Sequence, residues 1–229
     1  MPIVLICTKG VIPVIKKGPQ KSGSSRIIDL ASGSGGGLLS ICEYLEKEVP
    51  ELKITLTDLY PNVAAFEQMR RSKPCFDYVS EPVDATSVPK KLRGFRPQFL
   101  SFHHLRPLQA QQVLQNAVDT RNCIGIFEAQ DRSVLSMTAM FFSPLTLWLI
   151  TPLIRPFRLS RMIFTYFIPV LPLMVCWDGI VSSLRTYSLT EMQSLIQSLE
   201  QQDSFEWEMG KVRSGPGQVQ YLLGYPKKS

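Results

Sequence analysis

The sequence has few cysteines, and they are scattered. Five cysteines occur among 229 residues, at positions 7, 42, 75, 123 and 176, with no CxxC pair. A disulfide framework or a zinc site needs clustered cysteines, so we expect neither, and a reducing compartment fits this usage best. Histidines and carboxylates do not cluster at metal-ligand spacing either, so we predict no metal.

Runs of one charge are also missing. The formal net charge is +6, but no run holds five or more basic residues. The chain is therefore interpreted as merely basic, and no nucleic-acid partner is expected. The apolar start from Pro2 to Ile15 lacks a basic leader and a clear cleavage site, so we expect no signal peptide and predict a cytoplasmic location.

What the sequence does contain is an alternation of strand and helix patterns. Strands are expected at 26–31, 53–59, 76–83, 98–102 and 123–128, and helices at 38–45, 63–71 and 108–118. This order predicts an α/β fold with a mostly parallel sheet and helices on both faces. A helix at 188–199 and two closing strands at 205–212 and 218–224 follow. Residues 1–25 are interpreted as an N-terminal arm that ends in a linker from Lys16 to Ser25.

A glycine-rich turn lies between the first strand and the first helix. It reads Ser-Gly-Ser-Gly-Gly-Gly over residues 32–37. Glycine lets a ligand approach the backbone, and the helix N-terminus offers unpaired N–H groups. A phosphate-binding P-loop would need a lysine here, and the third glycine of a dinucleotide fingerprint would fall at Leu38.

The segment from Ile27 to Gly35 resembles motif I of the class I S-adenosylmethionine-dependent methyltransferases, with Ala31 at the place of the first glycine. The resemblance implies a Rossmann-like, doubly wound sheet of seven strands with an antiparallel final strand, formed by residues 26–229. It also implies S-adenosylmethionine as the cofactor. The residues of this turn that it assigns to cofactor binding are Asp29, Ala31, Ser32, Gly33 and Gly35.

Two further acidic residues stand where the family binds its cofactor. Asp58, next to Leu59, ends the second strand, and a carboxylate there can accept hydrogen bonds from ribose hydroxyls. Asp84 and Ala85 follow the third strand, and the resemblance implies that they meet the adenine. The competing interpretations are a helix cap for Asp58 and a turn or cap for Asp84.

The only histidines, His103 and His104, directly follow the fourth strand. The carboxyl ends of parallel strands face the ligand crevice in this fold class, so these are candidate catalytic or substrate-positioning groups, with His103 favoured as a base. A plain hydrogen-bonding role is the alternative. The Asn/Asp-Pro-Pro motif and the Pro-Cys nucleophile of base methyltransferases are absent at this position, which disfavours methylation of DNA bases.

Residues 133–178 break the alternation with a long, proline-rich, apolar insertion. Three interpretations remain open: a lid or pocket for a lipophilic acceptor, a hairpin in the membrane interface through residues 139–177, or a dimer contact or extra core. A pair of membrane spans is not favoured, because prolines interrupt both apolar blocks.

These observations predict methyl transfer from S-adenosylmethionine to a small-molecule or lipid-like acceptor, by an enzyme that is cytoplasmic or peripheral to the inner face of a membrane. The alternative is a catalytically inactive methyltransferase fold that serves as a binding or membrane-associated module. The oligomeric state and the acceptor atom are not specified by the sequence.

Overall fold

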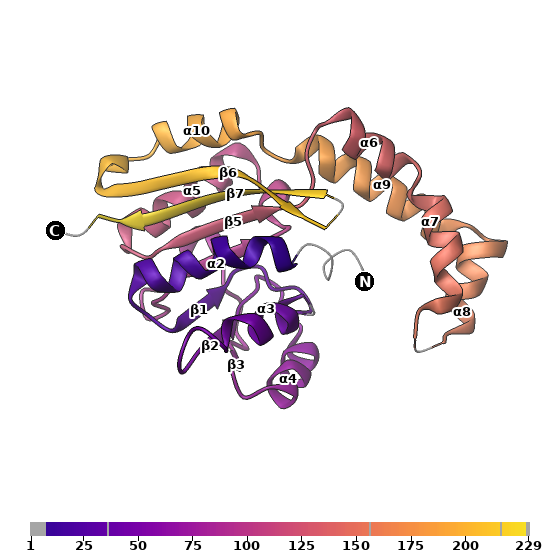
Figure 1. Ribbon diagram of the computed structural model, residues 1–229, viewed down its shortest axis with the longest axis horizontal. Helices are drawn as coiled ribbons and strands as arrows, with labels where there is room; N and C mark the ends of the chain where they lie inside the picture. Colours follow the sequence, from indigo (N-terminus) through magenta and orange to yellow (C-terminus); the bar gives the residue numbers. More distant parts are fainter. Residues whose placement is uncertain (1–7, 36, 156, 216, 228–229) are drawn as a thin grey trace. The chain divides into compact units, whose positions relative to one another are not determined.

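The computed structural model describes residues 8–35, 37–155, 157–215 and 217–227 (Figure 1). These residues form two compact units. Unit 1 comprises the chain up to Ala129 and from Leu189 onward, and unit 2 runs from Gln130 to Ser188. Unit 2 thus contains the whole apolar segment 133–178.

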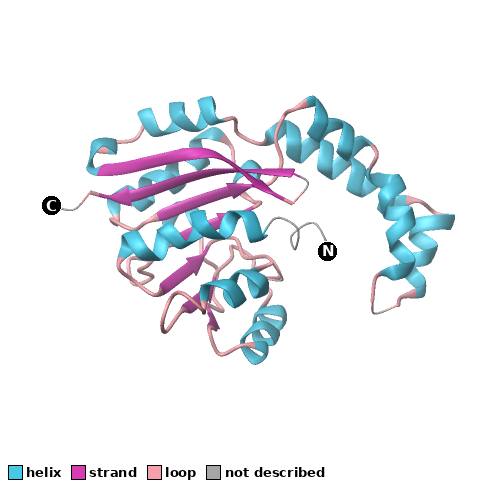
Figure 2. Ribbon diagram, in the orientation of Figure 1, coloured by secondary structure: helices cyan, strands magenta, loops and turns pink. Residues whose placement is uncertain are grey.

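Unit 1 is built on seven strands in two sheets (Figure 2). The first sheet has the order β1-β2-β3 and the second the order β4-β5-β7-β6. The neighbouring strands are parallel, except that β7 runs antiparallel to both β5 and β6. The strands are β1 (Arg26–Asp29), β2 (Lys53–Leu56), β3 (Phe76–Tyr78), β4 (Arg96–Phe99), β5 (Ile124–Glu128), β6 (Phe205–Ser214) and β7 (Gly217–Pro226).

The single seven-stranded sheet of the prediction is not matched. Between β1 and β4 only two isolated parallel bridges form, Ile27 with Phe95 and Leu30 with Gln98. Pro97 gives a physical reason: its carbonyl accepts from Leu30 N–H at 2.9 Å, but its ring nitrogen has no proton to donate back. The ladder is therefore interrupted, although β1 and β4 still lie side by side.

Five helices are described in unit 1. They are α2 (Thr8–Ser22), α3 (Leu38–Leu45), α4 (Val63–Ser72), α5 (Pro107–Asp119) and α10 (Leu189–Gln197). Helices α3, α4 and α5 fall where the sequence predicts them, and their buried apolar residues face the strands. Figure 2 shows helices in front of and behind the strands of this unit.

Helix α2 corrects the linker prediction for residues 16–25. The segment is helical to Ser22, and Val11, Val14 and Ile15 lie in the core. The glycines that indicated a linker are contact points instead. A Cβ on Gly18 would meet the Phe95 ring at 2.4 Å, and one on Gly10 would meet the Arg213 carbonyl at 2.1 Å. Close packing on the strands therefore outweighs the poor helix propensity of this segment.

The prediction of unpaired cysteines is also wrong. The structure joins Cys42 and Cys75 by a disulfide across 33 residues. Cys42 lies on the buried face of α3 and Cys75 directly precedes β3, so the fold brings together two residues that are far apart along the chain. Cys123 and Cys176 are free, and Cys7 lies outside the described residues.

Unit 2 is helical. Its helices are α6 (Val134–Phe141), α7 (Ser143–Ile150), α8 (Leu159–Met162) and α9 (Val170–Arg185), with short helical turns at Thr151–Leu153 and Ile163–Phe167. Helices α6 and α7 both pack against α9. In the described parts of the chain, no single helix is long and apolar enough to cross a membrane. Two bent helix pairs, 134–153 and 159–185, meet these criteria of length and composition when the two helices of each pair are counted as one.

Candidate functional site

The glycine turn after β1 forms a tight loop whose backbone is exposed. Ala31, Gly33 and Gly35 all have positive φ, at 56°, 56° and 68°. Ser32 N–H donates to the Thr57 carbonyl at 2.9 Å, which ties the loop to the segment after β2. A Cβ on Gly33 would meet nothing within 4 Å, so this part of the loop faces open space that a ligand can enter.

Asp29 ends β1 beneath this loop and is buried. Its Oδ1 finds no hydrogen-bond partner among the described residues. Burial raises the pKa of the Asp29 carboxyl to about 7; a hydrogen bond with Ser32 lowers it in part, and the nearby Asp58 charge raises it further. A ligand with a hydrogen-bond donor could bind at the base of the glycine loop and supply the partner that this buried acceptor lacks.

Asp58 is the residue that organises the loop. One carboxylate oxygen accepts from Gly33 N–H at 2.8 Å, and the other accepts from Tyr60 N–H at 2.9 Å. The helix-cap interpretation does not apply here, because Asn62 caps α4 by accepting from Ala65 N–H. Each carboxylate oxygen has a second lone pair, so Asp58 can still accept from a ligand hydroxyl. Leu59 beside it is exposed.

Asp84 lies beside Asp58, because Val83 N–H donates to the Asp58 carbonyl at 2.8 Å. Asp84 caps the short turn Ala85–Ser87, and its Oδ1 accepts from both the backbone and the hydroxyl of Thr86. Asp84 is therefore a cap, as the alternative interpretation of the sequence predicts, but it caps through one carboxylate oxygen only. The residue is exposed, at the carboxyl end of the β3 segment, where a ligand can reach it.

His103 and Glu128 form a buried pair at the carboxyl ends of β4 and β5. His103 Nδ1 lies 2.8 Å from Glu128 Oε2. The other carboxylate oxygen, Oε1, accepts from the backbone N–H groups of Phe102 and His103, at 2.8 and 3.2 Å. Glu128 therefore fixes both the backbone and the ring of His103. Glu128 ends β5, which is buried along its whole length in the structure, and a carboxylate buried there needs such partners.

The two histidines differ in exposure. The ring centroids of His103 and His104 are 4.3 Å apart, but His103 is buried and His104 is exposed. Leu100, which precedes them, has a positive φ of 50°. A leucine in this region is strained, and such strain is most often retained near functional sites.

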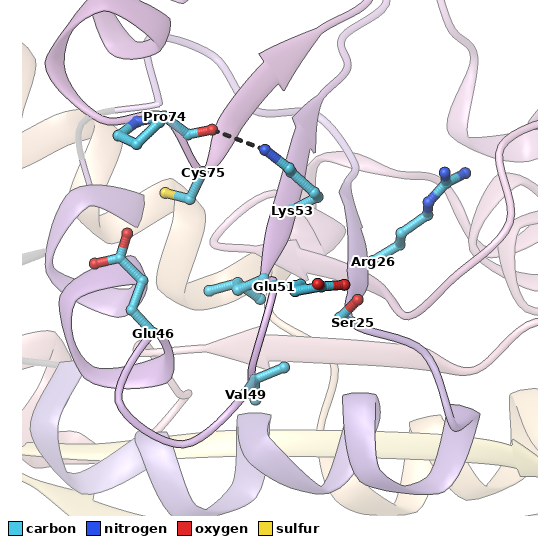
Figure 3. Close-up of a pocket in the computed structure, with 9 residues that line it drawn as sticks. Ser25, Arg26, Glu46, Val49, Glu51, Lys53, Pro74 and Cys75 are labelled. Carbon is cyan, nitrogen blue, oxygen red and sulfur yellow. Dashed lines mark hydrogen bonds between the residues drawn. The ribbon is translucent and has the colours of Figure 1, made fainter.

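One pocket lies away from these residues, at the opposite ends of the strands (Figure 3). It has a volume of about 640 Å³ and is lined by residues that begin β1 and β2 or precede β3, among them Arg26, Lys53 and Cys75. Glu46 also lines it, and its carboxylate lies within 4.8 Å of the Cys42 and Cys75 sulfurs. Paired sulfurs offer no thiolate to a metal ion, so this group is not a metal site in the disulfide form.

No protein-family model and no curated protein sequence matches the chain. Solved structures do match. Mitomycin 7-O-methyltransferase has a TM-score of 0.54 at 13% identity over 94% of this chain and 53% of its own. Human N-acetylserotonin methyltransferase, in complex with SAM, has a TM-score of 0.53 at 14% identity over 95% and 52%.

A SAM-dependent methyltransferase from Aquifex aeolicus has a TM-score of 0.53 at 14% identity, over 97% of this chain and 93% of its own. The chain spans about half the length of several other neighbours. At these identities the likeness concerns the fold. The predicted resemblance is confirmed at that level: the chain has the fold of the class I S-adenosylmethionine-dependent methyltransferases.

Proposed function

We propose that this protein transfers the methyl group of S-adenosylmethionine to a hydroxyl oxygen of a small, lipophilic acceptor. The observation that carries the proposal is Asp58, which lies at the end of β2 and holds the Gly33 N–H of the glycine loop. An acidic residue in that position, over an open loop, suits a ribose in this fold class. Several structural neighbours are small-molecule O-methyltransferases, which supports oxygen as the acceptor atom.

The residues present fit this cofactor. Asp58 accepts from the ribose hydroxyls, and Asp84 with the Ala85 N–H meets the adenine. The loop with Ser32, Gly33 and Gly35 would contact the remaining part of the cofactor. Asp29 Oδ1, which has no partner among the described residues, offers a hydrogen-bond acceptor beneath that loop. S-adenosylmethionine supplies a methyl group already activated on a sulfonium, so the protein has to align the acceptor and exclude water.

A hydroxyl acceptor loses a proton when it attacks, which calls for a base. His103 takes this role in our proposal. An ionised Glu128 only accepts hydrogen bonds, so the 2.8 Å contact places the proton of a neutral imidazole on Nδ1 and leaves Nε2 to receive the acceptor's proton. Glu128 acts through His103: it orients the ring and stabilises the imidazolium. His104 is the alternative base.

The acceptor is proposed to be lipophilic because the chain devotes residues 133–178 to an apolar segment, which is more than a soluble polar substrate needs. No residue pattern points to a nucleic-acid acceptor. A cytoplasmic enzyme at the inner face of a membrane would meet such an acceptor in the lipid.

The test is calorimetric titration of the full chain with S-adenosylmethionine in mild detergent. Wild type is expected to bind saturably. Asp58→Ala is expected to bind at least about tenfold more weakly, because the substitution removes one charge-assisted hydrogen bond to the cofactor. Asp77→Ala is the matched control, since that carboxylate is exposed and accepts from the neighbouring Tyr78 N–H, away from the glycine loop. Circular dichroism checks that each variant is folded.

With binding established, labelled methyl transfer to a panel of phenols and lipid alcohols tests the base. His103→Gln should lose at least about a hundredfold in turnover with little change in cofactor affinity, whereas His104→Gln should stay close to wild type. Folded wild type that binds no cofactor would reject the enzyme and favour the inactive binding module.

A further inference from the structure

Unit 2 exposes its large apolar side chains. Among the described residues, all the exposed large hydrophobics but four lie in this unit; the four in unit 1 are Leu59, Tyr60, Val63 and Leu108. Leu149, Leu153, Phe167 and Trp177 are 77%, 78%, 83% and 73% exposed. Water-soluble proteins rarely expose a continuous apolar surface of this kind, which marks a site of contact with lipid or protein.

Most buried positions of unit 2 hold a threonine, a serine or a glycine; the others are Pro172 and Tyr187. Thr151 and Thr165 are buried, and each hydroxyl donates to a carbonyl of its own helical turn, Leu147 and Arg161, at 2.7 Å. Gly179 is buried against Met140, where a Cβ would meet the sulfur at 2.6 Å. Small residues between helices and hydroxyls bonded back to the helix are typical of helix packing in lipid.

The indole of Trp148 forms a further hydrogen bond within the unit. Its Nε1 donates to the Thr165 carbonyl at 3.0 Å, and its own carbonyl accepts from the Tyr166 hydroxyl. These bonds satisfy several polar groups within the unit, although the buried hydroxyls of Ser143 and Ser183 have no partner among the described residues. In hydrocarbon, backbone polar groups have to be satisfied in this way, because no water is present to bond them.

Charge between Ser133 and Trp177 has one sign, and the two acidic residues of unit 2, Asp131 and Asp178, flank this stretch. From Ser133 to Trp177 the sequence contains no Asp, Glu or Lys. Its only charged residues are Arg155 and Arg158, in the connection between the two bent helix pairs, and Arg161, in α8. Arg155 and Arg158 are exposed. An apolar surface with arginines and no acids complements an anionic lipid surface, where each arginine contributes to attraction by phosphate groups.

We propose that unit 2 embeds in a phospholipid bilayer, with its apolar side chains in the acyl region and Arg155 and Arg158 at lipid phosphates. The bends of 46° and 76° in the two helix pairs suit a helical hairpin that lies along the bilayer surface, so that its apolar side chains reach the acyl region and the connection with Arg155 and Arg158 stays at the level of the phosphates. The occupant of the apolar surface is lipid, not a second copy of the chain. This proposal stands apart from methyl transfer.

The experiment is flotation of the full chain with vesicles after detergent removal, using phosphatidylcholine alone and phosphatidylcholine with phosphatidylglycerol. Wild type should float with both, with the higher affinity for the anionic vesicles, and the bound fraction should resist an alkaline wash. The double variant Leu149→Asp/Phe167→Asp should bind at least roughly tenfold less, because a carboxylate is costly in hydrocarbon. Leu108→Asp, at an exposed leucine of α5 in unit 1, should float like wild type.

A separate pair of substitutions tests the role of the arginines. Arg155→Gln/Arg158→Gln should lower binding to the anionic vesicles by about fivefold per arginine, and leave binding to phosphatidylcholine unchanged. In a Trp207→Phe background the tryptophans left are Trp148 and Trp177, and their fluorescence should be quenched by brominated lipid. Each of these variants is checked for folding by circular dichroism.

Wild type that stays in the lipid-free fraction as a discrete species would overturn the proposal. A dimer by light scattering that the double variant dissociates, without vesicle binding, would show that a second copy covers the surface instead. Equal binding of wild type to both vesicle types would overturn the assignment of the arginines to phosphate.

Discussion

The two units of this protein distribute polarity in opposite ways. Unit 1 buries large apolar residues such as Leu45, Phe66 and Leu114 completely, and exposes mainly polar ones. Unit 2 exposes leucines, phenylalanines and tryptophans and buries threonines and a glycine. Helix α7 is apolar all around its circumference, as expected for a helix without a water-facing side.

Backbone strain follows the same division. The non-glycine residues with positive φ in the described chain are Ala31, Glu51, Leu100, Arg121 and Gln201, and all of them belong to unit 1. Two of them lie at the candidate site: Ala31, two residues after β1, is in the candidate cofactor loop, and Leu100 directly follows β4 and precedes the histidine pair. Unit 1 therefore contains the kind of local conformation that a ligand site requires. The described part of unit 2 has no non-glycine residue with positive φ, although it includes a π-helical turn at Ile163–Phe167.

The strongest test of this contrast is the same substitution in both units. Leu114→Ala in α5 removes a fully buried side chain and should lower the free energy of unfolding by about 3 kcal/mol. Leu149→Ala in α7 removes a side chain that is 77% exposed and should change it by less than about 0.5 kcal/mol. Chemical unfolding of both variants in the same detergent measures the difference. Equal losses would mean that Leu149 is part of a packed core.

The pH dependence of stability provides a second, smaller test in unit 1. Burial raises the pKa of Asp29 from 3.8 to about 7, so the folded chain keeps a proton that the unfolded chain has already released. Stability from this group is present at low pH and is lost as the pH rises towards the folded pKa. Between about pH 5 and pH 8 the loss should be roughly 3 kcal/mol.

Asp29→Asn should remove that loss, because an amide of the same shape does not titrate. The wild type and the variant are compared by urea unfolding across this pH range, with Asp119→Asn, an exposed carboxyl, as the control. Parallel pH profiles for wild type and Asp29→Asn would contradict the raised pKa of Asp29.

The positions of the strands and central helices could be predicted from the sequence, because their patterns depend on local periodicity. Helix α2 could not. Its prolines, Pro13 and Pro19, and its glycines are poor helix formers, and the stabilising contacts come from strands about 80 to 200 residues further along the chain, through Phe95 and Arg213. The same limit applies to the disulfide, since Cys42 and Cys75 meet only through the fold.

At the candidate site, the sequence predicts which residues follow each strand but not what they contact. Asp58 was considered as a helix cap, yet its carboxylate holds Gly33 and Tyr60 N–H groups across the loop. Glu128 ends the fifth strand in the sequence, but only the fold shows that its partner is His103, 25 residues away. Such pairings depend on strand order, in which β4 and β5 are neighbours, and strand order is a property of the whole sheet.

The smallest expected effect concerns Ala31, which takes the place of a glycine in the cofactor loop. With φ at 56° its Cβ is crowded by the backbone, and Ala31→Gly should relieve this strain, for a net gain of about 0.5 kcal/mol after the greater freedom of glycine in the unfolded chain. The opposite sign is expected for Ala64→Gly, at an exposed position of α4, where glycine should cost about 0.5–1 kcal/mol. Thermal unfolding of the two variants measures both changes. If Ala31→Gly destabilises the protein as Ala64→Gly does, then the loop of unit 1 is not strained at this position, and the contrast in backbone strain between the two units loses its principal residue.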